Sequence, residues 1–202
     1  MKLILVTQPK FFVEEDQIIT NLFEEGLDLL HLCKPDTAPM YSERLLTLVP
    51  QVYRKRIVTH DFFYLKDEFK LYGIHLNERN TVPPEDYKGH LSCTCHSLEE
   101  LKEKKKNYNY VFLSPVFNSI SNPRILSGYT PEMLRKAYKD DLIDKRVMAF
   151  GGVNADKIPL LKDYGFGGVV IMGDIWKYFD DSSNKDYMDL IEYFRKLRKI
   201  VD

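Results

Sequence analysis

Val147-Met-Ala-Phe-Gly-Gly-Val153-Asn154 is the most informative segment of this chain. It is typical of a short buried strand that breaks at two glycines and continues into a helix beginning near Asn154. Gly151 and Gly152 allow a tight turn and leave their N–H groups uncovered by side chains. Asn154 is a favourable N-cap, and the start of a helix favours an anion. The stretch therefore predicts a strand followed by an anion-binding turn.

A second strand of the same kind follows at Gly167-Gly-Val-Val-Ile-Met-Gly173. In a (β/α)8 barrel, the loops after the seventh and eighth strands together form a phosphate site. Two neighbouring strands that end in glycine match such a pair of loops. The alternative is a purely structural strand–turn–helix, which occurs in any α/β protein.

The composition limits the class of protein. The chain has 202 residues, of which 44% are hydrophobic, and its formal net charge is −1. A chain of this length can form one domain with a sizeable core, so we expect a single domain over residues 1–202. Without an excess of basic charge, nothing points to nucleic acid or to an anionic membrane as a partner.

Targeting and redox signals are consistent with a cytoplasmic protein. The run Met1–Thr7 is apolar but too short for a signal sequence, and no apolar run approaches the roughly 18 residues that a membrane span needs. Three cysteines do not make a disulfide framework. We therefore expect a cytoplasmic location.

Short apolar runs alternate with amphipathic stretches along the whole chain. The apolar runs are Leu3–Val6, Leu29–Leu32, Arg56–Thr59, Gly73–Leu76, Leu91–Thr94, Tyr110–Leu113, Arg146–Phe150 and Val169–Met172. Each precedes a helical pattern except the fourth, which precedes a turn at Pro83-Pro84 and an abbreviated helix. Strands separated by helical crossovers form a parallel sheet, and eight of them predict closure into a (β/α)8 TIM barrel. The last helix, near Tyr187–Ile200, carries an apolar stripe that we expect to pack on the barrel, although a partner-binding face is the alternative.

Four histidines fall at the predicted carboxyl ends of strands, where a barrel of this kind has its active site. They are His31, His60, His75 and His96. A single histidine in an apolar strand is most often a hydrogen-bonded core residue, but four at one rim favour a ligand-binding or proton-transfer site. His90 lies at the opposite end of its strand, and we expect it to be inert.

The sequence offers three alternatives to a histidine site. Cys93-Thr-Cys95-His96 resembles a metal knuckle, but strand alternation points both cysteines to the outer helices, and the spacing is not that of a zinc site. The histidines together with Asp61 could bind a catalytic metal. Cys33 could act as a nucleophile, although no single base partner can be named for it.

The chain resembles the thiamine phosphate synthase superfamily, which includes the TenI-type thiazole tautomerases. The resemblance extends over nearly the whole chain, and the order and spacing of its pieces carry it. The pieces are Gly73-Ile-His75-Leu, Thr94-Cys-His96-Ser, Ser114-Pro-Val-Phe117-Asn-Ser119, Ala149-Phe-Gly-Gly-Val-Asn154 and Gly167–Gly173. The family fold is a (β/α)8 barrel, in agreement with the pattern of strands and helices.

The resemblance implies a coupling of hydroxymethylpyrimidine diphosphate to a thiazole phosphate, with release of pyrophosphate and with Mg2+ as cofactor. Asp61 matches one of the family's two metal carboxylates, and the other falls on Asn80. The family's Gln-x-Arg-x-Lys after the second strand becomes His31-Leu-Cys33-Lys34-Pro35, so its basic positions are lost. Thr94 replaces a serine and would contact the pyrimidine diphosphate.

The phosphate side of the family's site is better preserved. The resemblance implies that Gly151, Gly152, Met172 and Gly173 hold the thiazole phosphate through main-chain N–H groups, and that Ser119 and Ser121 add hydroxyls. The lysine that follows them in the family is Asn122 here. We expect the four rim histidines to line the pocket, one of them as the acid or base.

Two other functions remain open. The tautomerases isomerise a carboxythiazole phosphate without a metal, but the position of their proposed base is Pro115 in this chain. A non-catalytic protein that binds a thiamine precursor is the other possibility. Barrels of this kind are often dimers or larger, so a homo-oligomer is also expected, although no residue identifies an interface.

Overall fold

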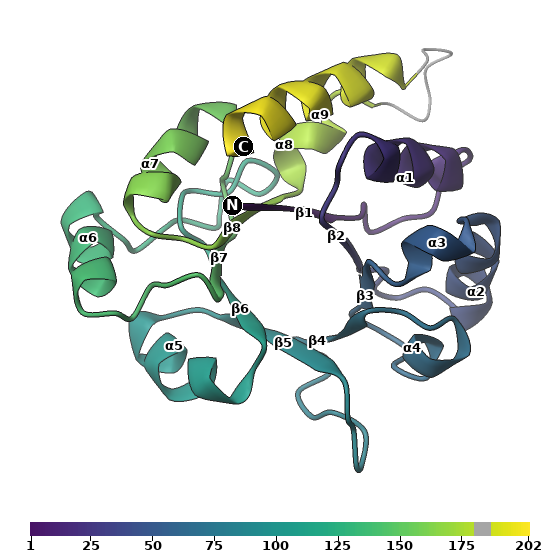
Figure 1. Cartoon of the computed structure of the whole chain (residues 1–202), viewed down its shortest axis with the longest axis horizontal. Coiled ribbons are helices and arrows are strands. Elements are labelled where there is room, and N and C mark those ends of the chain that lie inside the picture. Colours follow the sequence, from purple (N-terminus) through teal and green to yellow (C-terminus); the bar gives the residue numbers. More distant parts are fainter. Residues whose placement is uncertain (180–186) are drawn as a thin grey trace.

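The computed structural model describes residues 1–179 and 187–202. Within these residues, eight parallel strands form a closed barrel in chain order, and β1 pairs with both β2 and β8 (Figure 1). The strands are β1 (Lys2–Val6), β2 (Leu29–Leu32), β3 (Ile57–Thr59), β4 (Gly73–Leu76), β5 (His90–Cys95), β6 (Tyr110–Leu113), β7 (Val147–Ala149) and β8 (Gly168–Ile171). The predicted (β/α)8 TIM barrel is confirmed.

The helices surround the ring of strands, as Figure 1 shows. They are α1 (Glu15–Glu24), α2 (Pro39–Leu48), α3 (Gln51–Arg54), α4 (Leu65–Glu68), α5 (Leu98–Lys104), α6 (Pro131–Lys139), α7 (Ile158–Asp163), α8 (Gly173–Trp176) and α9 (Met188–Val201), with 3-10 turns η1 (Lys105–Asn107) and η2 (Ala155–Lys157). None of the helices in the described residues is long and apolar enough to cross a membrane.

The fourth strand–helix unit is shorter than predicted, since an abbreviated helix was expected there. No helix lies between β4 and β5 in the structure, and the connection extends outward from the ring as a loop (Figure 1). Asn154 caps the turn after β7, where its side chain accepts a hydrogen bond from the N–H of Lys157 at 3.2 Å. That turn begins as η2 and becomes α7 only at Ile158.

The strands divide the core into two parts. Ile4, Tyr110, Phe112, Met148 and Val170 pack together inside the barrel. Cys93 and Cys95 belong instead to the larger cluster between the strands and the outer helices, as the alternation along β5 predicted. The inward-facing partners on β5 are therefore Ser92 and Thr94.

Helix α9 packs on the barrel along an apolar stripe. Its buried residues are Leu190, Ile191, Phe194, Leu197 and Val201. The stripe repeats at helical spacing and packs against the barrel, so it is not a surface exposed to a partner.

Candidate active site

A cavity of about 270 Å³ lies where β6, β7 and β8 end, and we call it the phosphate-loop cavity. Its lining includes all six of the residues expected to hold a phosphate: Ser119, Ser121, Gly151, Gly152, Met172 and Gly173. The structure therefore brings these residues together, from three separate loops.

Two glycines give the phosphate-loop cavity its shape. Gly151 and Gly152 have φ angles of +87° and +67°, a region that residues with a side chain rarely adopt. A Cβ at Gly152 would lie 2.2 Å from the carbonyl oxygen of Asn118, and one at Gly151 would lie 2.8 Å from Pro115. The loop after β6 thus packs directly on the main chain of the turn after β7, which leaves no room for side chains there.

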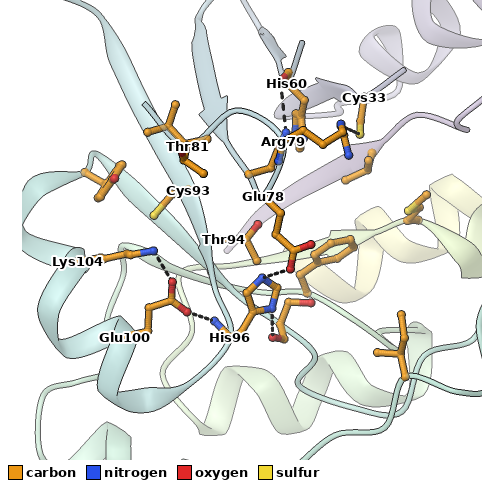
Figure 2. A pocket seen from close by; sticks show the side chains of 18 residues that line it. Cys33, His60, Glu78, Arg79, Thr81, Cys93, Thr94, His96, Glu100 and Lys104 are labelled. Atoms are coloured by element: carbon orange, nitrogen blue, oxygen red, sulfur yellow. Dashed lines mark hydrogen bonds and ion pairs between the residues drawn. The ribbon is translucent and has the colours of Figure 1, made fainter. Parts of the chain in front are cut away.

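A larger cavity of about 570 Å³ opens at the centre of the same face, and we call it the mouth cavity (Figure 2). His60, Thr94 and His96 contribute to its lining. It shares four lining residues with the phosphate-loop cavity, namely Ser114, Ile125, Phe150 and Met172. The two cavities therefore adjoin, and two ligands could lie side by side in them.

The four rim histidines lie at different depths. His31 and His75 are fully buried inside the barrel and do not line either cavity, contrary to the expectation for all four. Their register on β2 and β4 places them one layer below the ends of the strands. His60 is 7% exposed and lines the mouth cavity, whereas the side chain of His96 is 51% exposed. His60 and His96 can therefore contact a ligand directly.

The buried histidines are joined to polar neighbours. His31 Nδ1 lies 2.8 Å from His60 Nε2, and His31 Nε2 lies 2.8 Å from the hydroxyl of Tyr110. Burial lowers the pKa of His31 and His75 well below the ordinary value, with the neighbouring histidines adding to the effect. Burial and the nearby Arg79 lower the pKa of His60 to about 3. All three imidazoles are therefore neutral near pH 7.

His96 is held at the rim by two contacts. Its Nδ1 lies 3.1 Å from the carbonyl oxygen of Ser114, to which it donates. Its Nε2 lies 3.8 Å from a carboxylate oxygen of Glu78, as Figure 2 shows. These two contacts hold an exposed imidazole at the edge of the mouth cavity.

His31, His60 and His75 also form a cluster whose nitrogen atoms lie within 4.8 Å of one another. Two imidazole ligands of one tetrahedral zinc ion stand about 3.3 Å apart, given Zn–N bonds of about 2.0–2.1 Å. The 2.8 Å between His31 and His60 is the length of a hydrogen bond instead. The rings of His60 and His75 stack at 4.3 Å and 20°, so their nitrogens do not converge on a common point. His31 and His60 are joined by a hydrogen bond, whereas His75 bonds to Ser92 and Thr94 instead.

The carboxylate of Asp61 is occupied by protein donors. Arg79 approaches it at 3.1 Å and the side-chain amide of Asn80 at 3.2 Å, while the N–H of Lys34 lies at 3.3 Å. A Mg2+ ion prefers several oxygen ligands, usually with more than one carboxylate or phosphate among them. Asn80 supplies an amide donor where the family has its other carboxylate. The donor set around Asp61 therefore does not fit a resident Mg2+ ion.

Lys34 does not replace the lost basic residues of the second loop. Its Nζ is buried and lies 2.5 Å from Glu15 Oε1 and 4.4 Å from the ring centroid of Phe11, away from the mouth cavity. Burial raises the pKa of Glu15 to about 7, against the opposing effect of Lys34, and burial lowers the pKa of Lys34. This pair is a structural contact between the first residue of α1 and the loop after β2.

The structure supports neither Cys33 as a nucleophile nor Cys93 and Cys95 as metal ligands. Burial raises the pKa of Cys33, so its thiol is not activated as a nucleophile. Cys93 and Cys95 face the outer helices, away from the buried histidines. All three cysteines are free thiols.

Arg79 is the functional candidate that sequence reasoning missed. It comes from the loop between β4 and β5, and its guanidinium lies 3.1 Å from Asp61 Oδ1. The guanidinium also faces Cys33, as Figure 2 shows. Its side chain is 44% exposed and lines the mouth cavity. The only signal in the sequence is a basic residue next to the Asn80 that replaces a family carboxylate.

Comparison with known proteins gives a consistent result. The family model described as thiamine monophosphate synthase matches residues 3–175. A structure of thiamine phosphate pyrophosphorylase from Bacteroides thetaiotaomicron is 58% identical, with a TM-score of 0.93 over 100% of this chain and 98% of that chain. No curated protein matches the chain significantly.

More distant structures share the fold alone. Thiamine phosphate pyrophosphorylase from Pyrococcus furiosus is 20% identical, with a TM-score of 0.72 over 99% of this chain and 95% of that one. Tryptophan synthase subunit alpha from Legionella pneumophila str. Paris is 14% identical, with a TM-score of 0.67 over 100% and 92%. Because the family model spans most of the barrel and the Bacteroides protein aligns over its whole length, this chain belongs to the thiamine monophosphate synthase family.

Proposed function

We propose that the protein is a thiamine phosphate synthase, which joins hydroxymethylpyrimidine diphosphate to a thiazole phosphate. The pair of adjoining cavities is the observation that carries this proposal, since the reaction needs two phosphorylated substrates side by side. The bond between the pyrimidine's methylene carbon and the diphosphate oxygen breaks, and the diphosphate leaves with the electron pair. The thiazole nitrogen then bonds to that carbon.

The thiazole phosphate would occupy the phosphate-loop cavity. Main-chain N–H groups at Gly151, Gly152, Met172 and Gly173 are suited to its oxygens, and Ser119 and Ser121 offer hydroxyl donors. Because both glycines in the β7 turn lack a side chain, the phosphate can approach the main chain closely.

The pyrimidine diphosphate would occupy the mouth cavity, with Thr94 beside it. Arg79 supplies positive charge that can stabilise the leaving diphosphate. Since Asp61 is already paired with Arg79, any Mg2+ would enter with the diphosphate as part of the substrate. His60 and His96 are the histidines that line the mouth cavity and can contact the ligands there.

A metal-independent thiazole tautomerase is the second candidate, and the pairing of Asp61 with Arg79 favours it. Such an enzyme would isomerise a carboxythiazole phosphate with no pyrimidine present. The expected cytoplasmic location agrees with three free cysteines, and homo-oligomerisation stays a prediction.

A turnover assay separates these functions. Purified protein is incubated with both substrates, with Mg2+ or with a chelator, and thiamine phosphate and pyrophosphate are measured. The proposal predicts that the two products form in equal amounts. Isomerisation of carboxythiazole phosphate that is unaffected by the chelator, without coupling, would identify the tautomerase. Binding of both ligands with no turnover would identify a non-catalytic binding protein.

A further inference from the structure

Helix α9 contacts the segments that follow two of the three loops around the phosphate-loop cavity. It lies beside α7 and α8 and contacts both, as well as η2 (Figure 1). The turn η2 comes directly after the glycine turn that follows β7. Helix α8 begins after β8 at Gly173, which lines the cavity. One helix on the outside of the barrel therefore touches the continuation of both loops.

A single side chain of α9 connects the two loops. The hydroxyl of Tyr193 donates a hydrogen bond to Oδ2 of Asp174, the residue that follows Gly173. The main-chain N–H of Ala155, the first residue of η2, interacts with the same hydroxyl. Burial and the bond to Asp174 raise the pKa of Tyr193, so the phenol keeps its proton at neutral pH and can donate it. Tyr193 thus bridges the segments after β7 and β8.

Asp174 depends on this bond because its carboxylate is buried. The residue is 1% exposed, and its Oδ1 lies 2.6 Å from Nζ of Lys177. A buried carboxylate oxygen that loses its donor is costly, so removal of the Tyr193 hydroxyl should displace the first turn of α8. Since Gly173 directly precedes Asp174, its N–H would move with that turn.

We propose that Tyr193 is a positioning residue, which holds Gly173 and the glycine turn after β7 at the spacing that one phosphate group spans. This inference rests on the proposed function, in which thiazole phosphate occupies the phosphate-loop cavity. Tyr193 does not line that cavity and acts only through Asp174 and Ala155.

The only tryptophan of the chain reports on this turn without any ligand. Trp176 lies in α8, two residues after Asp174, and is 7% exposed. Its indole N–H donates to the carbonyl oxygen of Val6 at 2.8 Å. In Tyr193→Phe, we expect the fluorescence maximum of Trp176 to move to longer wavelength, because a displaced turn admits water to the indole. An unchanged spectrum would show that the turn does not need the hydroxyl, and the proposal would be wrong.

Tyr187→Phe is the matched control on the same helix. Tyr187 directly precedes α9, and its hydroxyl accepts a hydrogen bond from the side-chain amide of Asn21 in α1 at 3.2 Å. The variant therefore also loses one tyrosine hydroxyl, but at a contact with α1 rather than with the phosphate loops. Urea unfolding should show similar stability for Tyr187→Phe and Tyr193→Phe, and only the latter should change the Trp176 emission.

Kinetics and calorimetric titration test the positioning itself. In Tyr193→Phe, the Kd and the KM for thiazole phosphate should rise about tenfold, in line with one lost hydrogen bond to a charged group. The KM for the pyrimidine diphosphate and kcat should stay as in wild type, and so should all values for Tyr187→Phe. Asp174→Asn keeps an oxygen for the Tyr193 hydroxyl, so it should retain wild-type affinity. If Asp174→Asn binds as weakly as Tyr193→Phe, the charge of Asp174 matters rather than this bond, and the proposal is wrong.

The failures of the two proposals can be told apart. If wild type and Tyr193→Phe bind thiazole phosphate equally tightly, Tyr193 has no positioning role, whether or not coupling occurs. If Tyr193→Phe shows the expected loss of affinity but wild type forms no thiamine phosphate, only the coupling function is wrong. If wild type does not bind thiazole phosphate at all, both proposals are wrong.

Discussion

Arg79 and Asp61 determine how much positive charge the mouth cavity can offer to a diphosphate. The guanidinium is half-exposed and paired with a single carboxylate, so part of its charge remains available to a ligand. The basic residues that the family carries after the second strand are missing, and Lys34 is turned into the protein. Among the single residues of the site, Arg79 is therefore the one on which diphosphate binding depends most.

We therefore expect Arg79→Gln to raise the KM for the pyrimidine diphosphate about tenfold, the lower end of the range for a charged hydrogen bond at a partly exposed site. The KM for thiazole phosphate should not change. Steady-state kinetics would measure both values. Arg44→Gln, at an exposed position of α2, is the matched control and should behave as wild type. Equal effects on both substrates would argue against this role for Arg79.

The buried histidines make stability depend on pH. The pKa of His60 falls from 6.5 to about 3 on folding, so the unfolded chain binds more protons than the folded one below about pH 6.5. The free energy of unfolding is fully present above that pH and decreases as the pH falls toward 3. For His60 alone, we expect a loss of about 2 kcal/mol between pH 7 and pH 5.

Urea unfolding at pH 7 and pH 5 tests this prediction on wild type and His60→Gln. The glutamine cannot titrate but retains an amide for hydrogen bonding, so the variant should lose less stability between the two values. If both proteins lose the same free energy, His60 is not neutral in the folded state.

The sequence predicted the positions of some site residues but not of others. The alternation along β5 was sufficient to place Thr94 inward and Cys93 outward. The depth of His31 and His75 was not predictable, because it depends on the register between strands, which a period of two does not specify. Arg79 lies in a loop without periodicity, so only the folded chain brings it to Asp61.

Among the elements of the fold, the turn between β7 and η2 restricts its residue types most strongly. The left-handed φ of Gly152 and the close carbonyl oxygen of Asn118 exclude any side chain there. We expect Gly152→Ala to displace the loop after β6 and to weaken thiazole phosphate binding at least tenfold, with a loss of stability of about 1–3 kcal/mol.

Calorimetric titration with thiazole phosphate and urea unfolding would measure these two effects. Gly128→Ala is the matched control, because a Cβ at Gly128 would meet nothing within 4 Å. It should leave both binding and stability unchanged. Wild-type affinity in Gly152→Ala would mean that the phosphate does not bind against this turn.

Strands and helices were predicted correctly where the hydrophobic pattern was long enough to show a period. All eight strands and the closing helix lie where the apolar runs and the apolar stripe predicted them. Helix α8 was not predicted, since Gly173-Asp-Ile-Trp176 is too short to display a helical period. The prolines between β4 and β5 predicted an abbreviated fourth helix, and the structure has none there.

For the whole molecule, closure of the barrel by β1 and β8 is what brings the loops of distant segments to one face. The phosphate-loop cavity is lined by the loops after β6, β7 and β8, and the mouth cavity adds residues from the loops after β2, β3, β4 and β5. Their four shared residues make one continuous site with two compartments. The repeat of strands and helices predicted this common face, but it could not predict that two cavities would adjoin.

Two adjoining cavities should allow two phosphorylated substrates to bind at the same time. This can be tested by calorimetric titration of thiazole phosphate into protein that is already saturated with inorganic pyrophosphate. We expect thiazole phosphate to bind with an affinity within about twofold of that for the free protein, because the two anions lie in separate cavities. If the two anions compete, so that the apparent affinity for thiazole phosphate falls in proportion to the pyrophosphate concentration, the protein has a single anion site and the assignment of two cavities to two substrates is wrong.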